Sequence, residues 1–387
     1  MKISYKSVLM LLIFLFLYFI MATPGVTKYI IIIVLSVFFV ILNKRYRINN
    51  RTLIYMLPSL VYIFWGLVAG LMKGSFSFYG IKQAVFYLVP VCAAILIYNK
   101  VGNKLSKKIV DIQLIAIAIV FLLDNFSKFT IEDLMESEYA FIFGIYVILY
   151  VYQKKYTKTV FTAVLMVLSH KRIVNGATIV CVLLIIIFNR LNEGKKKKLL
   201  SLFSLLVLLM LYGYIYLSSS TFIHQIFGKY GINTQGRLEV WDTLTSYYKF
   251  NVFYGGNGIG WILNYLAGIQ RTAFSNLHND LLSAYIELGF MGYGVWISSY
   301  YHVLKRTRMK IAGDQYIIGL FFLYTFIIYA TDNISIYVNY WFPLYLIILS
   351  LADYNGNNEF QVKYSINKSN DGSAKNSMET AQNNEVM

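Results

Sequence analysis

Residues 275–289 read SNLHNDLLSAYIELG, and this stretch decides the fold. Before it, residues 218–279 form a long and largely polar segment, and after it an apolar run continues to about residue 304. A histidine, an asparagine and an acid stand at the junction, as His278, Asn279 and Asp280. The pattern predicts a polar loop that re-enters a membrane as a helix, with other polar groups brought to the same membrane face by upstream segments.

The amino-acid composition is typical of an all-α, polytopic integral membrane protein. Hydrophobic residues make up 58% of the chain and charged residues only 14%, whereas a soluble domain carries about 25% charged residues. Apolar runs near the length of a membrane-crossing helix recur along the chain and predict about twelve transmembrane helices. These spans are expected at residues 6–22, 27–43, 52–72, 81–98, 109–124, 138–153, 157–170, 173–189, 199–217, 280–304, 315–331 and 335–352. Together they form one transmembrane domain, residues 1–353, with a single large outer loop at about 218–279.

The 35 Lys and Arg residues give a net charge of +17 and are distributed in step with these spans. With the N-terminus inside, the short loops that hold most of the basic residues all fall on the cytoplasmic side, as the positive-inside rule predicts. Topology therefore explains the positive charge without a nucleic acid partner. The sequence predicts a plasma-membrane protein with both termini cytoplasmic and the loop at 218–279 outside. Residues 354–387 are rich in Asn, Ser, Lys and Glu, and we expect a disordered cytoplasmic tail.

A few basic side chains are expected on the outer face, where the positive-inside bias makes them unusual. Lys171 and Arg172 stand in a tight turn between two spans, and Arg237 begins a short amphipathic segment with Trp241 four residues later. Because the arginine fork makes two hydrogen bonds to phosphate oxygens, these cations favour a site for phosphate or pyrophosphate. Snorkelling to lipid headgroups and an interfacial Arg–Trp anchor are the alternatives. Lys82, at the outer end of the span at 81–98, could join the cationic cluster or snorkel as well.

The outer loop contains glycines at alternate positions, Gly256, Gly258 and Gly260. No strand precedes them and no helix with a lysine follows, so the pattern does not indicate a nucleotide site. Such glycines let the backbone approach a ligand or another helix closely, and both alternatives stay open. Cys92 and Cys181 lie inside apolar runs and the four histidines are scattered, so we expect neither a disulfide nor a metal site.

The junction offers a histidine for proton transfer. A helix N-terminus disfavours a protonated imidazole, so a neutral His278 could accept a proton from a hydroxyl. A polar interface residue is the alternative interpretation. Asn276 or Asn279 could cap the helix. Asp280 and Glu287 share a helix face, and an acid about two turns inside a membrane is usually functional or paired. Glu287 could therefore have a functional role, or it could pair with a basic residue and position it. Asp332, in the last outer turn, is a weaker candidate.

These features resemble the Wzy/WaaL-type O-antigen polymerase and ligase family of bacterial surface-polysaccharide enzymes. Members have many spans and a long, late outer loop that ends in His-Asn before a helix with Glu and Gly, as His278 to Gly289 do here. An Arg-x-x-x-Trp segment, a Gly-x-Gly-x-Gly turn and an earlier Ser-x-x-Arg element are similar to Arg237–Trp241, Gly256–Gly260 and Ser169–Arg172. The resemblance covers about residues 165–300, and its early motif leaves open whether Lys171 or Arg172 makes the main contact.

The resemblance implies a GT-C-like helical bundle, no cofactor or metal, and substrates linked to undecaprenyl pyrophosphate. The expected activity is a polymerase that joins lipid-linked repeat units into a capsular or O-antigen-type polysaccharide, with membrane lipids, a flippase and a chain-length regulator as partners. The basic, Lys- and Asn-rich composition suits a Gram-positive source without lipid A, which favours a polymerase over a ligase. Catalysis is expected from His278, Arg237 and Arg172, and substrate binding from Lys171, Asn279, Asp280, Glu287, Trp241, Gly256, Gly258 and Lys82. A flippase of lipid-linked oligosaccharide and a ligase-like transferase of finished glycan are the alternative functions.

Overall fold

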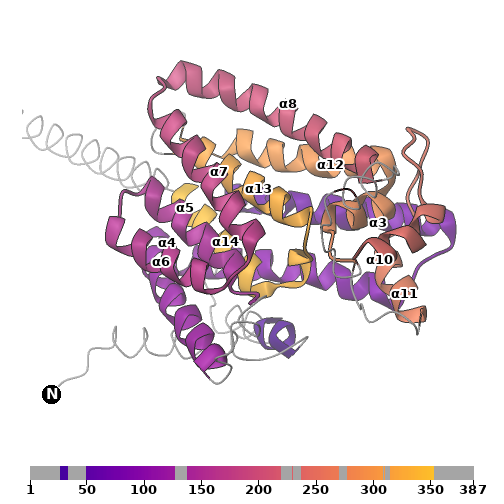
Figure 1. The fold of residues 1–387 in the computed structure, drawn as a ribbon, viewed down its shortest axis with the longest axis horizontal. Coiled ribbons are helices and arrows are strands. Elements are labelled where there is room, and N and C mark those ends of the chain that lie inside the picture. Colours follow the sequence, from indigo (N-terminus) through magenta and orange to yellow (C-terminus); the bar gives the residue numbers. More distant parts are fainter. Residues whose placement is uncertain are drawn as a thin grey trace, which may run out of the picture.

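The computed structural model describes residues 27–33, 49–126, 137–218, 229, 237–269, 277–307, 309 and 314–352. Within these ranges the chain forms helices and no strand (Figure 1), so the all-α prediction is confirmed for this part of the chain. The labelled elements are η1 (Asn50–Met56), α3 (Leu57–Lys73), α4 (Phe78–Phe126), α5 (Ala140–Tyr152), α6 (Tyr156–Leu168), α7 (Arg172–Asn189), α8 (Glu193–Ser218), α10 (Arg237–Leu244), η2 (Thr245–Tyr247), α11 (Trp261–Gly268), α12 (Asp280–Arg306), α13 (Tyr316–Tyr329), η3 (Ile334–Ile336) and α14 (Val338–Ala352).

The predicted spans from residue 52 onward each coincide with a helix. The spans at 81–98 and 109–124 are joined in α4, which continues through the predicted inner loop and is broken only at Gly102, where φ is 71°. Helices long and apolar enough to cross a membrane are Asn50–Lys73, Phe78–Asn103, Arg172–Asn189 and Glu193–Ser218, and α5, α6, α13 and α14 are shorter apolar helices. The predicted span at 6–22, most of that at 27–43 and the tail at 354–387 lie outside the described residues. Twelve spans therefore stay a prediction.

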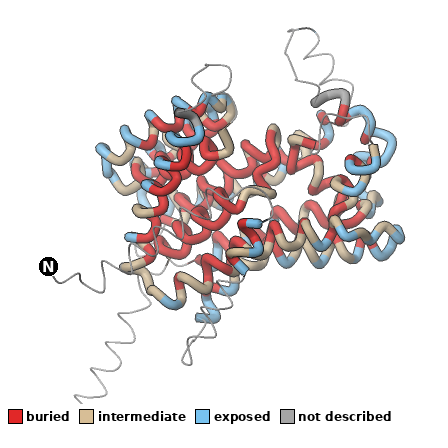
Figure 2. Tube along the Cα trace, turned by 90° about the horizontal axis from the view of Figure 1, so that it is seen from below, coloured by how far each residue is buried: buried red, intermediate tan, exposed pale blue. Residues whose placement is uncertain are grey.

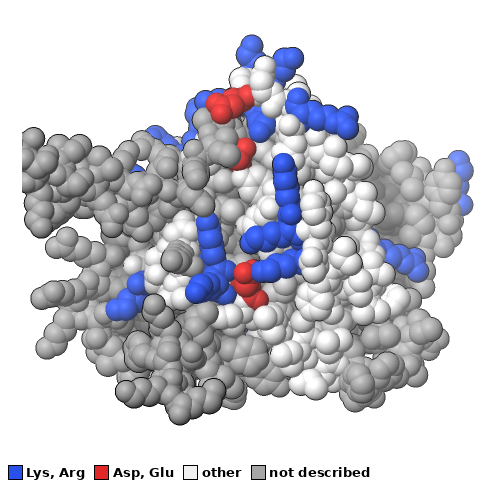
Figure 3. All heavy atoms as spheres, turned by 90° about the vertical axis from the view of Figure 1, so that its left-hand side faces the viewer, with Lys and Arg blue, Asp and Glu red and all other residues white. Residues whose placement is uncertain are grey.

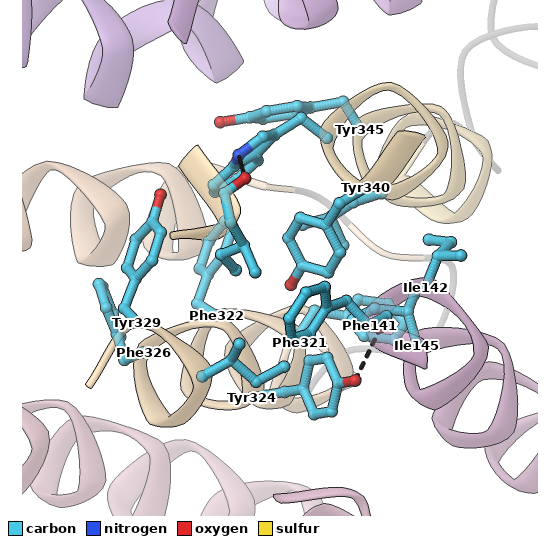
Figure 4. Packing of buried hydrophobic residues seen from close by; sticks show 14 of the residues in the cluster. Phe141, Ile142, Ile145, Phe321, Phe322, Tyr324, Phe326, Tyr329, Tyr340 and Tyr345 are labelled. Carbon is cyan, nitrogen blue, oxygen red and sulfur yellow. Dashed lines mark hydrogen bonds between the residues drawn. The ribbon is translucent and has the colours of Figure 1, made fainter. Parts of the chain in front are cut away.

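The helices pack as a bundle whose buried residues fill its middle (Figure 2). Helix α14 lies along α4, α12 lies along α3, and α5 packs against α6 and α7. Figure 4 shows where α13 meets α5 and α14: the Tyr324 hydroxyl donates to the Phe141 carbonyl over 2.7 Å. The hydroxyls of Thr325 and Tyr340 lie 2.6 Å apart. A buried hydroxyl without a partner is costly, so these bonds allow tyrosines to fill the core.

Helix α8 differs from the other long helices because it lies on the outside of the bundle (Figure 1). Only 17% of its most apolar window is buried, against 50% for Phe78–Asn103. Two tyrosines fasten its C-terminal turns to the bundle. Tyr212 donates to the Phe290 carbonyl over 2.7 Å, and Tyr214 donates to the Ala330 carbonyl over 2.6 Å.

Figure 3 views the bundle from the end away from α10 and α11, and Lys and Arg side chains are spread over that face. Two ion pairs lie on the side of the bundle that the charge map assigns to the cytoplasm. Lys158 lies 2.7 Å from Asp111, and Lys196 lies 3.5 Å from Asp314. Helices α10 and α11 belong to the predicted outer loop. Because both termini lie outside the described residues, the orientation of the chain in the membrane stays a prediction.

Candidate functional site

Three polar side chains from distant parts of the chain meet beside the N-terminus of α12. The Lys171 ammonium donates to Asp332 Oδ2 over 2.6 Å, and the two side chains are only 11% and 7% exposed. His278 Nδ1 lies 3.6 Å from the other oxygen, Asp332 Oδ1. The Lys171 ammonium also lies 4.0 Å from the centre of the Phe141 ring. We name this group of Lys171, His278 and Asp332 the junction cluster.

The electrostatics of the junction cluster keep Asp332 ionised. Burial by itself raises the pKa of the Asp332 carboxyl, but the neighbouring His278 and the Lys171 charge outweigh burial and hold that pKa below its usual range. A carboxylate beside Nδ1 favours the imidazole tautomer with its proton on Nδ1, which leaves Nε2 as a proton acceptor. A small side-chain shift would shorten the 3.6 Å separation to a hydrogen bond, and such bonds are often long before substrate binds.

The backbone at His278 is held in an unusual conformation. Its φ is 52°, in the left-handed region that costs a residue other than glycine about 1–3 kcal/mol. Both neighbours are fixed: Trp241 Nε1 donates to the Leu277 carbonyl over 3.1 Å, and Asn279 Oδ1 accepts from the Leu282 N–H over 3.0 Å. The Asn279 amide also donates to the Tyr214 hydroxyl over 2.6 Å. These contacts show Asn279 as the helix cap and hold the backbone on both sides of His278, whose Nδ1 faces Asp332.

The two arginines reach this region on separate helices. Arg172 is the first residue of α7, is exposed, and directly follows Lys171. Arg237 is the first residue of α10, and its side chain lies outside the described part of the chain. Trp241, one turn further along α10, makes the bond to Leu277 just described. The structure therefore joins α10 directly to the residue that precedes His278.

Lys82 takes a different position. It is half-buried on α4, with its ammonium 6.0 Å from the Tyr79 ring and 5.7 Å from the Phe86 ring. Its neighbour Gln83 turns inward and bonds Glu287. Cation–π contacts of this kind fit a snorkelling lysine, which is one of the two alternatives that the sequence leaves open.

Asp280 and Glu287 are both buried in α12, and their described partners are neutral donors. The Asp280 carboxylate accepts two bonds of 2.8 Å from the N–H and the hydroxyl of Ser335. Glu287 is fully buried and accepts from the Tyr62 hydroxyl over 2.7 Å and from the Gln83 amide over 2.8 Å. A third bond, of 3.3 Å, comes from the Ile262 N–H at the start of α11. None of these described partners is basic, so the alternative in which Glu287 pairs with a basic residue is wrong for the described contacts. Glu287 instead connects α3, α4 and α11 to α12.

Residues 254–260, which we name the glycine segment, pack against α12 at a point where that helix is interrupted. At that break Gly289 has a φ of 75°. The N–H groups of Asn257 and Gly258 donate to the carbonyls of Ile286 and Glu287, each over 2.9 Å. In return, the Phe290 N–H donates to the Tyr254 carbonyl over 2.8 Å. The segment thus supplies partners that the interrupted helix lacks.

Helix backbone occupies the space beside the glycines of this segment. A Cβ atom on Gly256 would lie 2.5 Å from the Glu287 carbonyl oxygen, and one on Gly258 would overlap the Gly70 backbone. Of the two alternatives, a ligand or another helix, the structure shows close approach to helices. Gly256 and Gly258 therefore have a packing role, and binding of substrate by them stays a prediction.

A small cavity with both polar and apolar lining residues lies between α4, α11, α12 and η3. It holds about 20 Å³, enough for one water molecule, and Gln83, Asp280, Glu287, Asn333 and Ser335 line it. In the ranges that the structure describes, no three His, Cys, Asp or Glu side chains gather as metal ligands would. The arrangement offers a proton acceptor beside a buried ion pair, with an exposed arginine next to it. Such a group suits reactions that deprotonate a hydroxyl near an anionic leaving group.

Comparison with known proteins supports a family assignment for part of the chain. A family model described as O-Antigen ligase matches residues 158–297. That range contains Lys171, Arg172, Arg237, His278 and Glu287. No curated protein matches the chain, and no solved structure matches it.

Proposed function

We propose that this chain, whose residues 158–297 match the O-Antigen ligase family model, is a membrane glycosyltransferase. It transfers a glycan from an undecaprenyl-pyrophosphate donor to a sugar hydroxyl on a second lipid-linked repeat unit, at the outer face of the plasma membrane. The product is a capsular or O-antigen-type polysaccharide. The observation that carries this proposal is the junction cluster, because it places a histidine beside a buried carboxylate that is itself paired with a lysine.

The proposed reaction is a displacement at the anomeric carbon of the donor. The acceptor hydroxyl oxygen forms the new bond to that carbon, and its proton moves to His278 Nε2. The bond from the carbon to the pyrophosphate oxygen breaks, and the lipid pyrophosphate leaves with the electron pair. Arg172 and Arg237 stabilise the charge that grows on the leaving group. Lys171 contributes less directly, because Asp332 already balances its charge.

Asp332 has a positioning role in this proposal, although the sequence ranks it as a weak candidate. It orients the His278 ring and balances the imidazolium that forms during the reaction, as carboxylates do beside catalytic histidines. Asp280 and Glu287 have an indirect role in this proposal, through the structure of α12. Their bonds to Ser335, Tyr62 and Gln83 fix the first two turns of α12, on which the position of His278 depends.

A transfer of finished glycan to another acceptor is the second candidate, and the description of the matching family favours it. Both reactions use the same donor and the same bond changes, and they differ only in the acceptor. The large outer loop and the position of the junction cluster near one end of the bundle argue against a flippase. A transporter places its charged groups near the middle of the membrane. A flippase and a chain-length regulator stay proposed partners.

The experiment uses purified protein, the lipid-linked repeat unit and no added metal. Ladders of longer glycan identify a polymerase. A single transfer to an added acceptor lipid, without ladders, identifies a ligase. If neither product forms and labelled lipid crosses proteoliposome bilayers instead, the chain is a transporter and the proposal fails.

Variants test the assignment of residues. His278→Ala should lower the rate of transfer by about 10²–10⁴-fold, the usual contribution of a general base. His302→Ala is the matched control, because His302 is exposed near the other end of α12. Arg237→Ala should also reduce transfer, with Arg190→Ala, at the far end of α7, as its control. Undiminished polymer in both His278→Ala and Arg237→Ala, at normal expression, would refute the proposed site.

A further inference from the structure

Helices α8, α12 and α13 leave an apolar crevice between them, and none of the residues that line it belongs to the junction cluster. Phe203 and Val207 of α8, Ile297 and Leu304 of α12, and Gly319 and Phe326 of α13 form its walls. The crevice is shallow, about 40 Å³, and opens to the outside of the bundle. Its presence agrees with the sparse packing of α8, of which only 17% of the most apolar window is buried. A shallow crevice of this kind can take one side of an acyl chain.

The crevice runs along the helix axes. Ile297 and Leu304 are two turns apart on α12, and Gly319 and Phe326 are two turns apart on α13. At 1.5 Å per residue each pair spans about 10 Å, which is several methylene groups of a lipid chain. Leu304 and Gly319 mark one end, beside the last turn of α12 and the first turn of α13. That end belongs to the side that the charge map assigns to the cytoplasm.

Two exposed lysines stand beyond that end of the crevice. Lys197 is four residues before Ser201 on α8, and Lys305 is four residues after Tyr301 on α12, so each lysine shares a helix face with a hydroxyl. The hydroxyls of Ser201 and Tyr301 lie 3.4 Å apart, so both lysines lie on adjoining helix faces. Lys196, which directly precedes Lys197, is paired instead with Asp314 at 3.5 Å.

We propose that this crevice binds an anionic phospholipid. The phosphate lies between the ammonium groups of Lys197 and Lys305, and one acyl chain lies along the apolar walls. The charge complementarity argues for an anionic headgroup, since basic pockets between membrane helices on the cytoplasmic side commonly bind such lipids. The bound chain covers apolar surface where α8 has few protein neighbours. It therefore holds the N-terminal half of α8, just as Tyr212 and Tyr214 hold the C-terminal half.

Native mass spectrometry of the full chain in detergent tests the proposal, with phosphatidylglycerol and phosphatidylcholine of the same acyl chains as probes. We expect tight retention of one phosphatidylglycerol and weaker retention of phosphatidylcholine. The variant Lys197→Gln/Lys305→Gln should bind phosphatidylglycerol about thirty-fold more weakly, because each lysine near an anionic surface contributes about 1 kcal/mol. Lys154→Gln/Lys155→Gln removes two exposed lysines from another turn on the same side and is the matched control.

Two further variants separate lipid binding from a folding defect. Lys197→Arg/Lys305→Arg keeps both charges and should retain phosphatidylglycerol like the parent protein. Ser204→Phe places a ring in the crevice and should reduce retention while both lysines remain. Equal retention of the two lipids by the parent protein, or a loss in the Lys154/Lys155 control as large as in the Lys197/Lys305 variant, would overturn the proposal. Enzymatic transfer is not needed for any of these measurements.

Discussion

Replacing Asp332 with asparagine isolates the ion pair of the junction cluster. The change removes the charge that balances Lys171 and keeps the size of the side chain. Because Lys171 and Asp332 are only 11% and 7% exposed, water cannot take over the role of the lost carboxylate. Breaking a buried pair on one side costs about 3–5 kcal/mol, so we expect a loss of unfolding free energy of that size.

The assay is reversible unfolding in detergent, followed by intrinsic fluorescence, with Asp111→Asn as the control. The Lys158–Asp111 pair has nearly the same length, 2.7 Å against 2.6 Å, but its side chains are 42% and 39% exposed. An exposed pair contributes about 0–1 kcal/mol. The two ion pairs therefore have nearly the same length and differ in burial. Each aspartate also accepts one neutral hydrogen bond, from Tyr150 over 2.9 Å at Asp111 and from the Asn333 N–H over 2.8 Å at Asp332. An asparagine oxygen can still accept these bonds, so the difference in unfolding free energy measures mainly the effect of burial.

A double variant tests the ion pair by removing both of its charges. Lys171→Met/Asp332→Leu replaces both charges with apolar groups, and such a replacement is often neutral. We expect it to be more stable than Asp332→Asn alone, while transfer activity is lost because His278 has no carboxylate beside it. If Asp332→Asn is no less stable than Asp111→Asn, or if the double variant is the least stable of the three, the argument from the buried pair is refuted.

Three other variants or conditions give direct readouts. The pKa of Asp332 is lowered in the folded protein, so its stabilisation is present above about pH 4 and is lost as the pH falls below that value; melting temperatures from pH 7 to pH 3 should fall more in the parent than in Asp332→Asn. Gly258→Ala should cost about 2–6 kcal/mol from strain at a φ of 96° and overlap with helix backbone, whereas Gly255→Ala, where nothing lies within 4 Å of the new Cβ, should cost little; equal stability of the two would contradict the packing role. Tyr62→Phe should cost about 1.5–3 kcal/mol by removing a hydrogen bond to Glu287, and an unchanged midpoint of unfolding would argue against that bond.

The positions of the helices could be predicted because the length of an apolar run is a local property of the sequence. Helix α12 begins at Asp280, as the junction predicts, and of the two candidate caps the structure uses Asn279. The interruption at Gly289 could not be predicted. A glycine inside an apolar run looks the same whether the helix continues through it or breaks there. The difference lies in residues 254–260, which supply the hydrogen bonds at the break.

The candidate site could be predicted only in part, for a related reason. The charge map assigns Lys171 and His278 to one membrane face, but it does not say which acid they meet. Asp332 is 161 residues from Lys171, and no local pattern joins them. Glu287 is recognisable as an unusual acid within an apolar helix. Its partner Tyr62, 225 residues away, is one tyrosine among 34 and carries no distinguishing signal.

The break at Gly289 ties the assembly of α12 to a segment that is synthesised before it. The ribosome delivers residues 254–260 ahead of residues 286–290, and the N-terminal parts of a chain generally settle first. A membrane helix with open backbone groups is unfavourable in lipid. With the loop at 218–279 outside, as the charge map predicts, helix α12 becomes stable only after the glycine segment has been translocated and can form hydrogen bonds with it. In this order of events, the predicted outer loop is exported before the following helix is inserted.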